Sequence, residues 1–455
     1  MDYNTDSTIV AISTPIGPGA ISIVRISGIN SLNIIKKIFV PKVKKDIKTH
    51  TIHYGYIFFN DKKIDEVIVS FMLHPNSYTK EDVVEINCHG GSITANDVLD
   101  VVINEGAVLA QPGEFTKRAF LNGRIDLIQA EAVIDIINSN NRASKEMSLN
   151  LLSGGLSKKI ENIRRGLLQC IASLEVAIDY PEEEYFNGTG EIQKFVNNSI
   201  LDIENLINVS KNFDLIKNGI STVIIGRPNV GKSSLLNFLL KEDKAIVTNI
   251  AGTTRDLVNG NFNIGHIPIN LIDTAGLRDT NDIVEQIGQE KTKEAIKNAD
   301  LVLSVLDISE EITSEDFEII NSAKDKRLII VCNKIDIRKD IFEKSVNNLR
   351  NIGKVVCISS MSGDGINSLI DEIFSFYPNT DVAGHMIMAN GRHLELLNKS
   401  IEYLKLSIET IKKEHSEEFI SLDLTNAYTS LGMILGNELD ESIIDKIFSE
   451  FCLGK

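Results

Sequence analysis

The first 120 residues carry short apolar runs separated by turn-forming residues. Runs of this length, with apolar and polar positions in alternation, predict β-strands. The clearest runs lie at 8–13, 21–26, 53–59, 66–73 and 83–87. Because turn signals separate these runs, residues 1–120 are predicted to form a mixed α/β domain.

Residues 121–217 change to apolar positions three and four residues apart, which is the spacing of an amphipathic helix. Two examples are DLIQAEAVIDII at 126–137 and IRRGLLQCIASLEVAI at 163–178. Pro181 and an acidic loop interrupt the pattern. Helical spacing returns at 381–455, and neither stretch looks able to fold alone. We therefore predict one helical domain that is split by an insertion.

The insertion, residues 218–380, alternates β-rich runs with helical patterns. The runs are STVIIG, INLID, LVLSVLD, RLIIVCN and KVVCIS. This alternation is typical of βαβ units and a mostly parallel sheet. The fold class predicted for the whole chain is therefore α/β plus α.

Charge and cysteine content narrow the possible functions. A net charge of −16 makes a surface that repels phosphate backbones, so RNA would need a local patch or a partner protein. Lys158, Lys159, Arg164 and Arg165 offer one helical face for RNA, although a solvated helix explains them equally well. Five cysteines without a CxxC pair favour a reducing cytoplasm. A basic start and an apolar run of about 18 residues are both missing, so neither secretion nor a membrane span is expected.

Gly226–Ser233, with the sequence GRPNVGKS, follows a predicted strand and precedes a helical pattern. This is the context of a phosphate-binding P-loop. Its glycines let backbone N–H groups turn toward the phosphates, and the helix start adds the positive end of its dipole. Lys232 is expected to reach the outer phosphates, and the Ser233 hydroxyl to bind Mg²⁺.

Three further segments follow, each with a different expected task at one nucleoside triphosphate. Gly252–Asp256 (GTTRD) lies in a loop where a threonine could meet Mg²⁺ and the γ-phosphate. Asp273–Gly276 (DTAG) ends a strand; its aspartate is expected near Mg²⁺ and its glycine amide near the γ-phosphate, although such an aspartate is often only a helix cap. The last carboxylate of Asn333–Asp336 (NKID) can accept two hydrogen bonds from guanine, which adenine does not offer. Together the segments predict a GTP site.

These motifs resemble those of the translation-factor-related GTPases, except that Leu277 stands where such enzymes carry a catalytic glutamine. With the ending Phe451–Lys455 (FCLGK), the whole chain resembles the MnmE (TrmE) family of tRNA-modification GTPases. The resemblance implies that Glu285 orients the attacking water, whereas a solvent-facing residue near a helix start is the plainer interpretation. It implies these nucleotide-binding residues: Asn229, Val230, Gly231, Lys232, Ser233, Ser234, Thr248, Asn249, Ile250, Ala251, Gly252, Thr253, Thr254, Asp273, Thr274, Ala275, Gly276, Asn333, Lys334, Asp336 and Ser359.

The resemblance also implies two metal ions at the nucleotide. Mg²⁺ would be held by Ser233 and Thr254, and K⁺ by Asn229 and the backbone carbonyls of Thr248, Ile250 and Thr253. A monovalent cation there supplies the charge that an arginine finger supplies elsewhere. SSMSGDG at 359–365 departs from the usual Ser-Ala-Lys of the base-supporting loop, so Ser359 and backbone amides are expected to serve there.

A second implied site binds 5-formyl- or 5,10-methylene-tetrahydrofolate. Its residues would be Arg25, Glu85, Arg124 and Lys455. Glu85 would pair with N–H donors of the pterin, while the cations would face the carboxylates or carbonyls of the folate. Without the resemblance, Arg25 and Glu85 look like ordinary ends of surface strands.

Cys452 lies on the short tail that follows the second helical stretch. The resemblance makes its thiol a candidate catalytic group, which the charge of Lys455 would assist; a tail without function is the alternative. Lys455 does not fit the last position of a prenylation signal. The other cysteines are expected to pack as small apolar groups. His89 is expected in a turn or core, because no ligands with metal-site spacing accompany it.

The resemblance implies a GTP-hydrolysing enzyme that adds a carboxymethylaminomethyl or aminomethyl group to C5 of the wobble uridine in tRNA. Its expected cofactors are Mg²⁺, K⁺ and the tetrahydrofolate derivative. The expected partners are tRNA, a second copy of the chain, and a FAD-containing protein of the MnmG (GidA) type in a heterotetramer. The implied domains are 1–120 for folate binding and dimerisation, 218–380 for GTP, and 121–217 with 381–455 for the helical domain.

Two other classes of protein remain open. A GTP-switched ribosome-assembly or RNA-binding factor would share the GTPase motifs, but it should carry a basic RNA-binding module. An ATP-using kinase would show no discrimination by Asp336.

Overall fold

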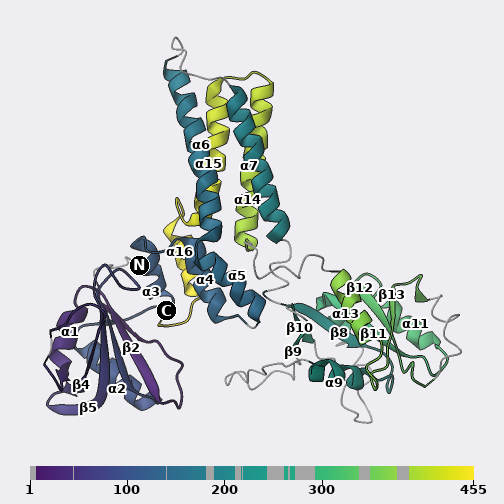
Figure 1. The fold of residues 1–455 in the computed structure, drawn as a ribbon, viewed down its shortest axis with the longest axis horizontal. Helices are drawn as coiled ribbons and strands as arrows, with labels where there is room; N and C mark the ends of the chain where they lie inside the picture. The colour runs from purple at the N-terminus through teal and green to yellow at the C-terminus, as the bar shows by residue number, and fades with distance from the viewer. Residues whose placement is uncertain are drawn as a thin grey trace. The chain divides into compact units, whose positions relative to one another are not determined.

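The computed structural model forms two compact units: residues 1–138, 148–204 and 392–455 belong to the first, and residues 139–147 and 205–391 to the second (Figure 1). The described residues are 7–44, 46–139, 141–180, 189–210, 217, 219–242, 261–264, 267–271, 293–337, 349–376 and 389–454. The side chains of residues 240–242, 261–267 and 441 are excepted.

The first unit begins with a seven-stranded mixed sheet in the order β3-β4-β5-β6-β2-β1-β7. The strands are β1 (Ile9–Ile12), β2 (Ile21–Ser27), β3 (Phe39–Pro41), β4 (Thr51–Phe59), β5 (Lys62–Met72), β6 (Val83–His89) and β7 (Val108–Leu109). β1 and β7 are parallel, and the other neighbours are antiparallel. Four of the five predicted runs coincide with the four long strands, and the fifth contains β1.

The two faces of this sheet differ. α1 (Ser31–Ile38) and α2 (Ser92–Asn104) pack their apolar sides against one face, where they share a core with the inward residues of the strands. The opposite face carries exposed apolar side chains, and we call Ile21, Ile52, Tyr54 and Ile68 the open sheet face. Successive residues of a strand point to opposite faces of the sheet. Apolar residues on β4 and β5 therefore contribute both to the core under the helices and to the open sheet face.

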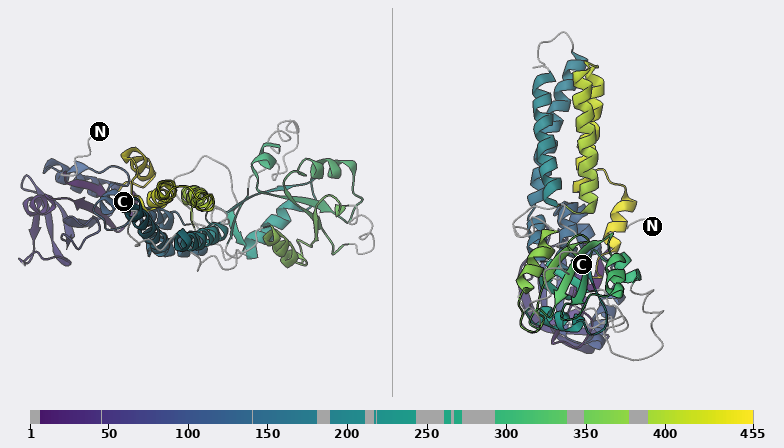
Figure 2. Two further views of the ribbon diagram at one scale, coloured as in Figure 1. Left: turned by 90° about the horizontal axis from the view of Figure 1, so that it is seen from above. Right: turned by 90° about the vertical axis from the view of Figure 1, so that its right-hand side faces the viewer.

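Helices make up the rest of the first unit, and three of them extend into the second. They are α3 (Glu114–Leu121), α4 (Leu127–Ile137), α5 (Arg142–Leu152), α6 (Gly155–Asp179), α7 (Thr189–Ser210), α14 (Gly391–Lys412), α15 (Glu417–Leu435) and α16 (Glu441–Ser449). Residues 142–147 of α5, residues 205–210 of α7 and residue 391 of α14 belong to the second unit. α6, α7, α14 and α15 run side by side as a bundle (Figures 1 and 2). The Ser400 hydroxyl on α14 donates to the Ala427 carbonyl on α15, and Lys405 of α14 pairs with Glu204 of α7 at 3.1 Å. The two helical stretches predicted from sequence therefore pack together.

A largely buried cluster of Glu131, Arg392 and His393 lies at the start of α14. Glu131 of α4 is 2.7 Å from Nε of Arg392 and 2.8 Å from Nε2 of His393. Arg392 also donates to the carbonyls of Met433 and Ile434, which end α15. Burial opposes the charged form of Glu131, but the hydrogen bond with His393 and the charge of Arg392 outweigh it and lower the pKa of this carboxyl to about 2. The cluster fixes α4, α14 and α15 to one another.

The second unit contains a six-stranded sheet in the order β13-β12-β11-β8-β10-β9, in which only the β9–β10 pair is antiparallel. Its strands are β8 (Ile220–Ile225), β9 (Asn261–Ile264), β10 (Ile267–Leu271), β11 (Leu301–Asp307), β12 (Arg327–Asn333) and β13 (Lys354–Cys357). α9 (Lys232–Glu242) and α13 (Ile366–Ser375) share the core on one face, and α11 (Ser314–Asn321) packs on the other.

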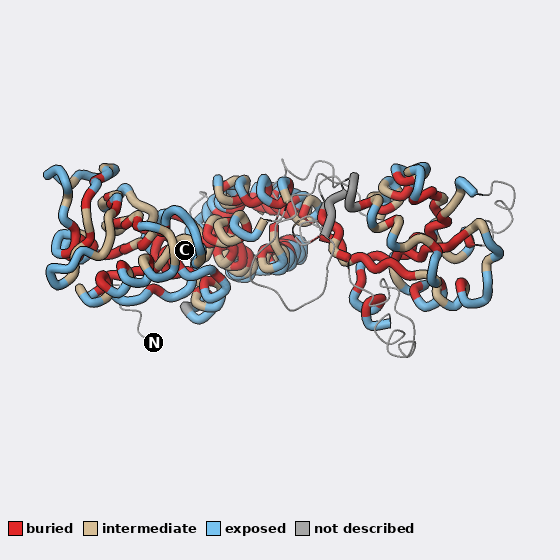
Figure 3. Tube along the Cα trace, turned by 90° about the horizontal axis from the view of Figure 1, so that it is seen from below, coloured by how far each residue is buried: buried red, intermediate tan, exposed pale blue. Residues whose placement is uncertain are grey.

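The central strands of this sheet are buried on both faces, and β11 is buried along its whole length (Figure 3). Such burial explains why these strands read as continuous apolar runs in the sequence. The predicted fold class of a mixed α/β domain, a helical domain and an inserted P-loop-type sheet is confirmed. The exact domain boundaries stay predictions.

Candidate functional sites

The predicted P-loop connects β8 to α9 in the second unit. Gly226 and Gly231 have φ angles of +147° and +99°, and Asn229 has a φ of +64°. A Cβ at Gly231 would lie 2.1 Å from Nδ2 of Asn333. Glycine is required at 231 both for this backbone conformation and for the close approach.

The ammonium group of Lys232 lies over this loop. Its Nζ donates to the carbonyl oxygens of Gly226 at 2.8 Å and Arg227 at 2.6 Å. Arg227 pairs through Nε with Oδ1 of Asp316 at 2.7 Å, and Asp316 also forms the capping box of α11. Ser233 follows in the first turn of α9, with its side chain exposed. A positive charge beside the N–H groups of a helix start is the arrangement that holds phosphate.

Asn333 connects two loops at the same edge of the sheet. Its side chain is fully buried, its Nδ2 donates to the Val230 carbonyl at 2.9 Å, and its Oδ1 accepts from the Ser360 amide at 3.0 Å. The P-loop and the loop at 359–365 are therefore held by one amide side chain. Because both its donor and its acceptor are used, Asn333 is positioned without strain in the core.

Lys334 follows with a φ of +67°, and its ammonium group forms an ion pair with the carboxylate of Asp307 at the end of β11. Burial opposes the charged form of Asp307, but hydrogen bonds from Lys334 and Ser309 outweigh it and lower the pKa of this carboxyl. The aliphatic part of Lys334 is thereby held at the edge of the sheet, next to Asn333, which connects the P-loop to the loop at 359–365.

The loop at 359–365 is closed by its own hydrogen bonds. The Ser359 amide donates to the Asp364 carbonyl at 2.9 Å, and the Ser359 carbonyl accepts from Gly363 at 2.8 Å. Its hydroxyl accepts from the Ser362 amide at 3.1 Å. Asp336 lies in the turn after β12. It is exposed, and its carboxylate has no hydrogen bond or ion pair within the described residues. The carboxylate is thus accessible to a ligand that offers N–H donors.

The first unit brings the other predicted group together. Arg25 in the middle of β2 lies opposite Glu85 in the middle of β6, and Arg25 Nε is 2.8 Å from Glu85 Oε1. Both side chains are partly exposed, at 16% and 21%. The guanidinium carbon of Arg124 lies 4.7 Å from the ring centroid of Tyr78, and that of Arg25 lies 6.0 Å from the same centroid. The surface therefore combines one carboxylate, two guanidinium groups and an aromatic ring.

The C-terminal tail docks beside these side chains. The Gly454 carbonyl accepts from Nη1 of Arg25 at 3.2 Å and from the Ser13 hydroxyl at 3.1 Å. The Cys452 carbonyl accepts from the Gly113 amide at 3.3 Å. The thiol-bearing side chain of Cys452 is exposed. The tail is thus held by its backbone, which leaves the thiol accessible at the edge of the site.

Comparison with known proteins finds relatives that match nearly the whole chain. A family described as GTP-binding protein TrmE N-terminus matches residues 8–124, and a family described as MnmE helical domain matches residues 127–452. The chain is 45% identical to tRNA modification GTPase MnmE of Thermoanaerobacter pseudethanolicus, with 98% of this chain and 99% of that protein covered. For the proteins of the same description from Clostridioides difficile and Lactococcus lactis, identity is 42% and 41%, with 99% and 98% of this chain and 99% and 98% of those proteins covered. The chain belongs to the MnmE family.

Membership of the MnmE family makes this chain a tRNA modification GTPase, which binds and hydrolyses GTP. The predicted enzyme class is therefore confirmed, and the alternatives of an ATP-using kinase and a ribosome-assembly factor are wrong. GTPases use Mg²⁺ with their nucleotide in general. Among the helices in the described ranges, none has the length and apolarity needed to cross a membrane.

Several predicted site residues fall outside the described ranges. They are Thr248, Asn249, Ile250, Ala251, Gly252, Thr253, Thr254, Asp273, Thr274, Ala275, Gly276, Glu285 and Lys455. Ser233 for Mg²⁺ and Asn229 for K⁺ are described, and both present exposed oxygen-bearing side chains in or next to the P-loop. This placement fits oxygen ligands of hard cations. The roles of all these MnmE-type residues stay predictions.

Two sequence predictions need correction. Arg164 does not belong to an exposed basic face, because its side chain is only 5% exposed and its guanidinium carbon packs 4.1 Å from the ring centroid of Tyr428. His89 is neither in a turn nor in the core: it ends β6, is exposed, and its Nδ1 lies 2.7 Å from Asp65. The hydrogen bond with Asp65 raises the pKa of His89. Within the described residues, no group of three or more His, Cys, Asp or Glu side chains could hold a metal.

Two residues of the sites were missed by the sequence analysis. Tyr78 carries no local motif, since it lies in the loop between β5 and β6 and meets the other residues only through folding. Asp307 could have been found, because an aspartate that ends a buried strand lies at the edge where parallel strands present their ligand sites.

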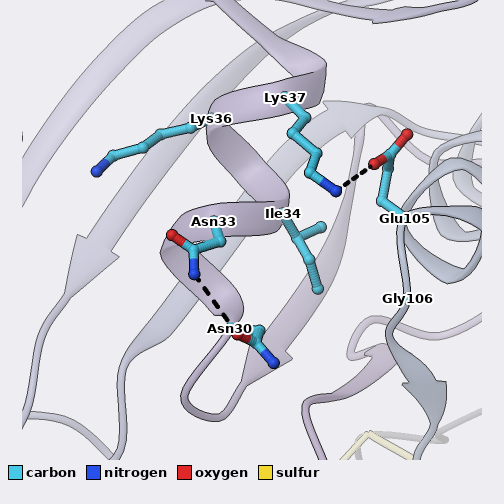
Figure 4. A pocket seen from close by; sticks show the side chains of 7 residues that line it. All are labelled: Asn30, Asn33, Ile34, Lys36, Lys37, Glu105 and Gly106. Atoms are coloured by element: carbon cyan, nitrogen blue, oxygen red, sulfur yellow. Dashed lines mark hydrogen bonds and ion pairs between the residues drawn. The ribbon is translucent and has the colours of Figure 1, made fainter.

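A cavity of about 560 Å³ lies elsewhere in the first unit (Figure 4). It is lined by Asn30, Asn33, Ile34, Lys36, Lys37, Glu105 and Gly106. Lys37 and Glu105 form an ion pair across it at 3.0 Å, on partly exposed side chains. None of the residues predicted for the MnmE-type sites lines this cavity, so it takes no part in the interpretation below.

Proposed function

We propose that this GTPase acts in adding a carboxymethylaminomethyl or aminomethyl group to C5 of the wobble uridine of tRNA. A tetrahydrofolate derivative is the one-carbon donor, and a FAD-containing protein of the MnmG type is the partner in a heterotetramer. The observation that carries the proposal is the meeting of Arg25, Glu85 and Arg124 with the docked tail that bears Cys452. The family resemblance assigns Arg25, Glu85 and Arg124 to folate binding and Cys452 to catalysis.

The chemistry of this surface fits a reduced folate. The second oxygen of Glu85 has no hydrogen bond or ion pair within the described residues, so it is accessible to N–H donors of a pterin. The two guanidinium groups offer planar donors for the carboxylates of the folate tail. Tetrahydrofolate, when bound, supplies the one-carbon unit. Lys455 is assigned to the same site as an additional cation.

Cys452 is the proposed catalytic residue of the modification step. Its exposed thiol lies two residues before Gly454, the residue whose carbonyl meets Arg25. We expect Cys452→Ser to abolish the modified nucleoside in tRNA while GTP hydrolysis continues. Modification that persists at the rate of the unchanged protein would remove this assignment.

At the nucleotide, Lys232 binds the outer phosphates and Asp336 selects guanine. Glu285 orients the attacking water, since Leu277 replaces the usual glutamine. K⁺ at Asn229, Thr248, Ile250 and Thr253 supplies positive charge beside the phosphates. We expect GTP turnover in KCl to exceed turnover in NaCl of equal ionic strength by at least about tenfold. Equal rates in the two salts would eliminate the monovalent cation site.

The open sheet face supports a homodimer through the N-terminal domain. Ile21, Ile52 and Ile68 are 60%, 71% and 44% exposed on neighbouring strands of one sheet. A group of exposed apolar side chains of this kind is typical of a surface that associates with another protein. Ile52→Lys should shift sedimentation of the purified chain from dimer to monomer; a monomeric unchanged chain would contradict the proposal.

The acidic net charge of the chain supports binding of the tRNA mostly by the partner protein. The proposed location of the reaction is the cytoplasm. The decisive experiment is mass spectrometry of nucleosides in tRNA from cells that lack the protein. We expect C5-modified wobble uridines to disappear and to return with the unchanged gene but not with an Arg25→Ala variant. An unaltered nucleoside profile would refute the proposed function.

A further inference from the structure

Tyr78 lies beside both arginines of the proposed folate site, although no motif assigned it there. It lies in the loop between β5 and β6 and is partly buried. The guanidinium carbons of Arg124 and Arg25 lie 4.7 Å and 6.0 Å from its ring centroid. Both arginines of the site therefore lie near one aromatic ring, and Arg25 also lies 5.6 Å from the ring centroid of Phe115.

The ring is fixed in place from several sides. Its hydroxyl is 2.9 Å from Oγ1 of Thr116, which is completely buried on α3. Its apolar part packs against two hydrophobic clusters of the first unit, one that includes Phe115 and one that includes Phe448 and Phe451. Since its polar end is bonded to Thr116, the contribution of Tyr78 to the site is the ring itself.

An aromatic ring at this point reduces the repulsion between the two guanidinium groups. Two guanidinium groups repel each other, and within the described residues Arg25 forms an ion pair with Glu85 whereas Arg124 forms none. The face of a tyrosine ring carries negative potential and attracts cations within about 6 Å. For partly exposed cations, this attraction changes an equilibrium by a factor of about 2 to 5 each.

We infer that Tyr78 is a positioning residue of the one-carbon-donor site, which holds Arg25 and Arg124 ready for an anionic reduced folate. The inference rests on the proposed function, because it assumes that the two arginines bind a folate. Tyr78 acts through the arginines and need not bond to the ligand. Its effect is therefore pre-organisation of charge, which increases affinity by reducing the cost of ordering two long side chains.

The test compares two variants of the full chain, Tyr78→Phe and Tyr78→Leu, by calorimetric titration with 5-formyl-tetrahydrofolate. Phenylalanine keeps the ring and loses only the bond to Thr116, so affinity should stay within about threefold of the unchanged protein. Leucine removes the ring, and affinity should fall about tenfold. Equal losses in both variants, or no loss with leucine, would overturn the inference.

A matched control is available in the helical bundle. Tyr428 also carries a guanidinium group on its ring, that of Arg164 at 4.1 Å. Tyr428→Leu loses the same kind of contact and should leave folate affinity unchanged. Circular dichroism of each variant verifies that the fold is retained. A loss of affinity in Tyr428→Leu equal to that in Tyr78→Leu would show a general effect on folding and refute the positioning role.

A double-mutant cycle separates positioning from general packing. In an Arg124→Ala background, Tyr78→Leu should reduce folate affinity less than it does alone, because part of the side chain's effect acts through Arg124. Strict additivity would contradict the inference. If Arg25→Ala leaves folate binding intact, the proposed function itself fails; if Arg25→Ala weakens binding and Tyr78→Leu does not, only the role of Tyr78 fails.

Discussion

The nucleotide site and the proposed folate site are built in opposite ways. The nucleotide site consists of loops that each follow a buried strand of one sheet, and Asn333 joins two of them through backbone atoms of Val230 and Ser360. The folate site depends on side chains from β2, β6 and two loops, and on a tail 429 residues away from Arg25 in sequence.

This difference separates local from long-range information. A segment made of a strand, a glycine-rich turn and a helix determines the geometry of its own phosphate site, because consecutive residues supply the backbone N–H donors. A site that joins Arg25 to Gly454 depends on folding of the intervening helices. The folate site should therefore be the more sensitive to substitutions that lie outside it, and the nucleotide site to substitutions within it.

The largest expected effect is at the nucleotide site. Lys232→Ala removes the charge that lies over the P-loop, and GTP turnover should fall at least about 1,000-fold. Binding of 5-formyl-tetrahydrofolate, measured on the same sample by calorimetry, should remain. Loss of both activities would mean that the two sites are not separate, and the comparison would fail.

Glu85→Gln should act on the folate site alone. The change keeps the shape of the side chain but removes the charge that pairs with Arg25 at 2.8 Å. Folate affinity should fall about 30-fold, which corresponds to the loss of about one charge-assisted hydrogen bond. Glu66→Gln, a neighbour on β5, serves as the matched control, and an equal loss there would contradict a specific role for Glu85.

Gly113→Ala should weaken the folate site from outside. A Cβ there would lie 2.5 Å from the carbonyl oxygen of Phe448, so the tail that bonds to Gly113 must shift. Folate affinity should fall about tenfold if one tail contact is lost. Gly106→Ala is the control, since Gly106 also has a positive φ of +107° but has nothing within 4 Å of an added Cβ. Equal effects would point to backbone strain instead of tail docking.

The smallest effect near neutral pH concerns the cluster that holds α4 to α14. The folded pKa of Glu131, about 2, lies below its ordinary value of 4.5, so its contribution to stability is present above pH 4.5 and is lost as the pH falls toward 2. The loss in unfolding free energy should stay within about 0.3 kcal/mol from pH 7 to 5 and reach about 2 kcal/mol by pH 3. Denaturant titrations of Glu131→Gln should lack this component; an identical pH dependence in that variant would exclude it.

Sequence patterns predicted the strands and helices well where an element is buried on one face or on both faces. The apolar runs of β8, β11 and β12 identify strands because both faces of that sheet are covered. The P-loop and Asn333 were predictable since their tasks are carried by consecutive residues. Arg164 was misplaced because a helical pattern of charges does not reveal that Tyr428, on a helix more than 250 residues away, packs over it.

Tyr78 shows the limit most clearly. Its charged and hydrogen-bonding neighbours are Arg25, Thr116 and Arg124, which belong to three separate segments of the chain. The spacing of these residues along the chain does not predict that they lie close together in the fold. The resemblance implied only that Lys455 joins Arg25 in one site. The hydrogen bonds of the tail backbone with Arg25, Ser13 and Gly113 were not predicted.

The double use of Asn333 also links the two ends of the nucleotide site. One amide group supports both the P-loop and the loop expected beneath the purine. Because both hydrogen bonds join protein groups, a shift of one loop passes directly to the other. A substitution that displaces the loop at 359–365 is therefore expected to disturb the phosphate-binding end as well.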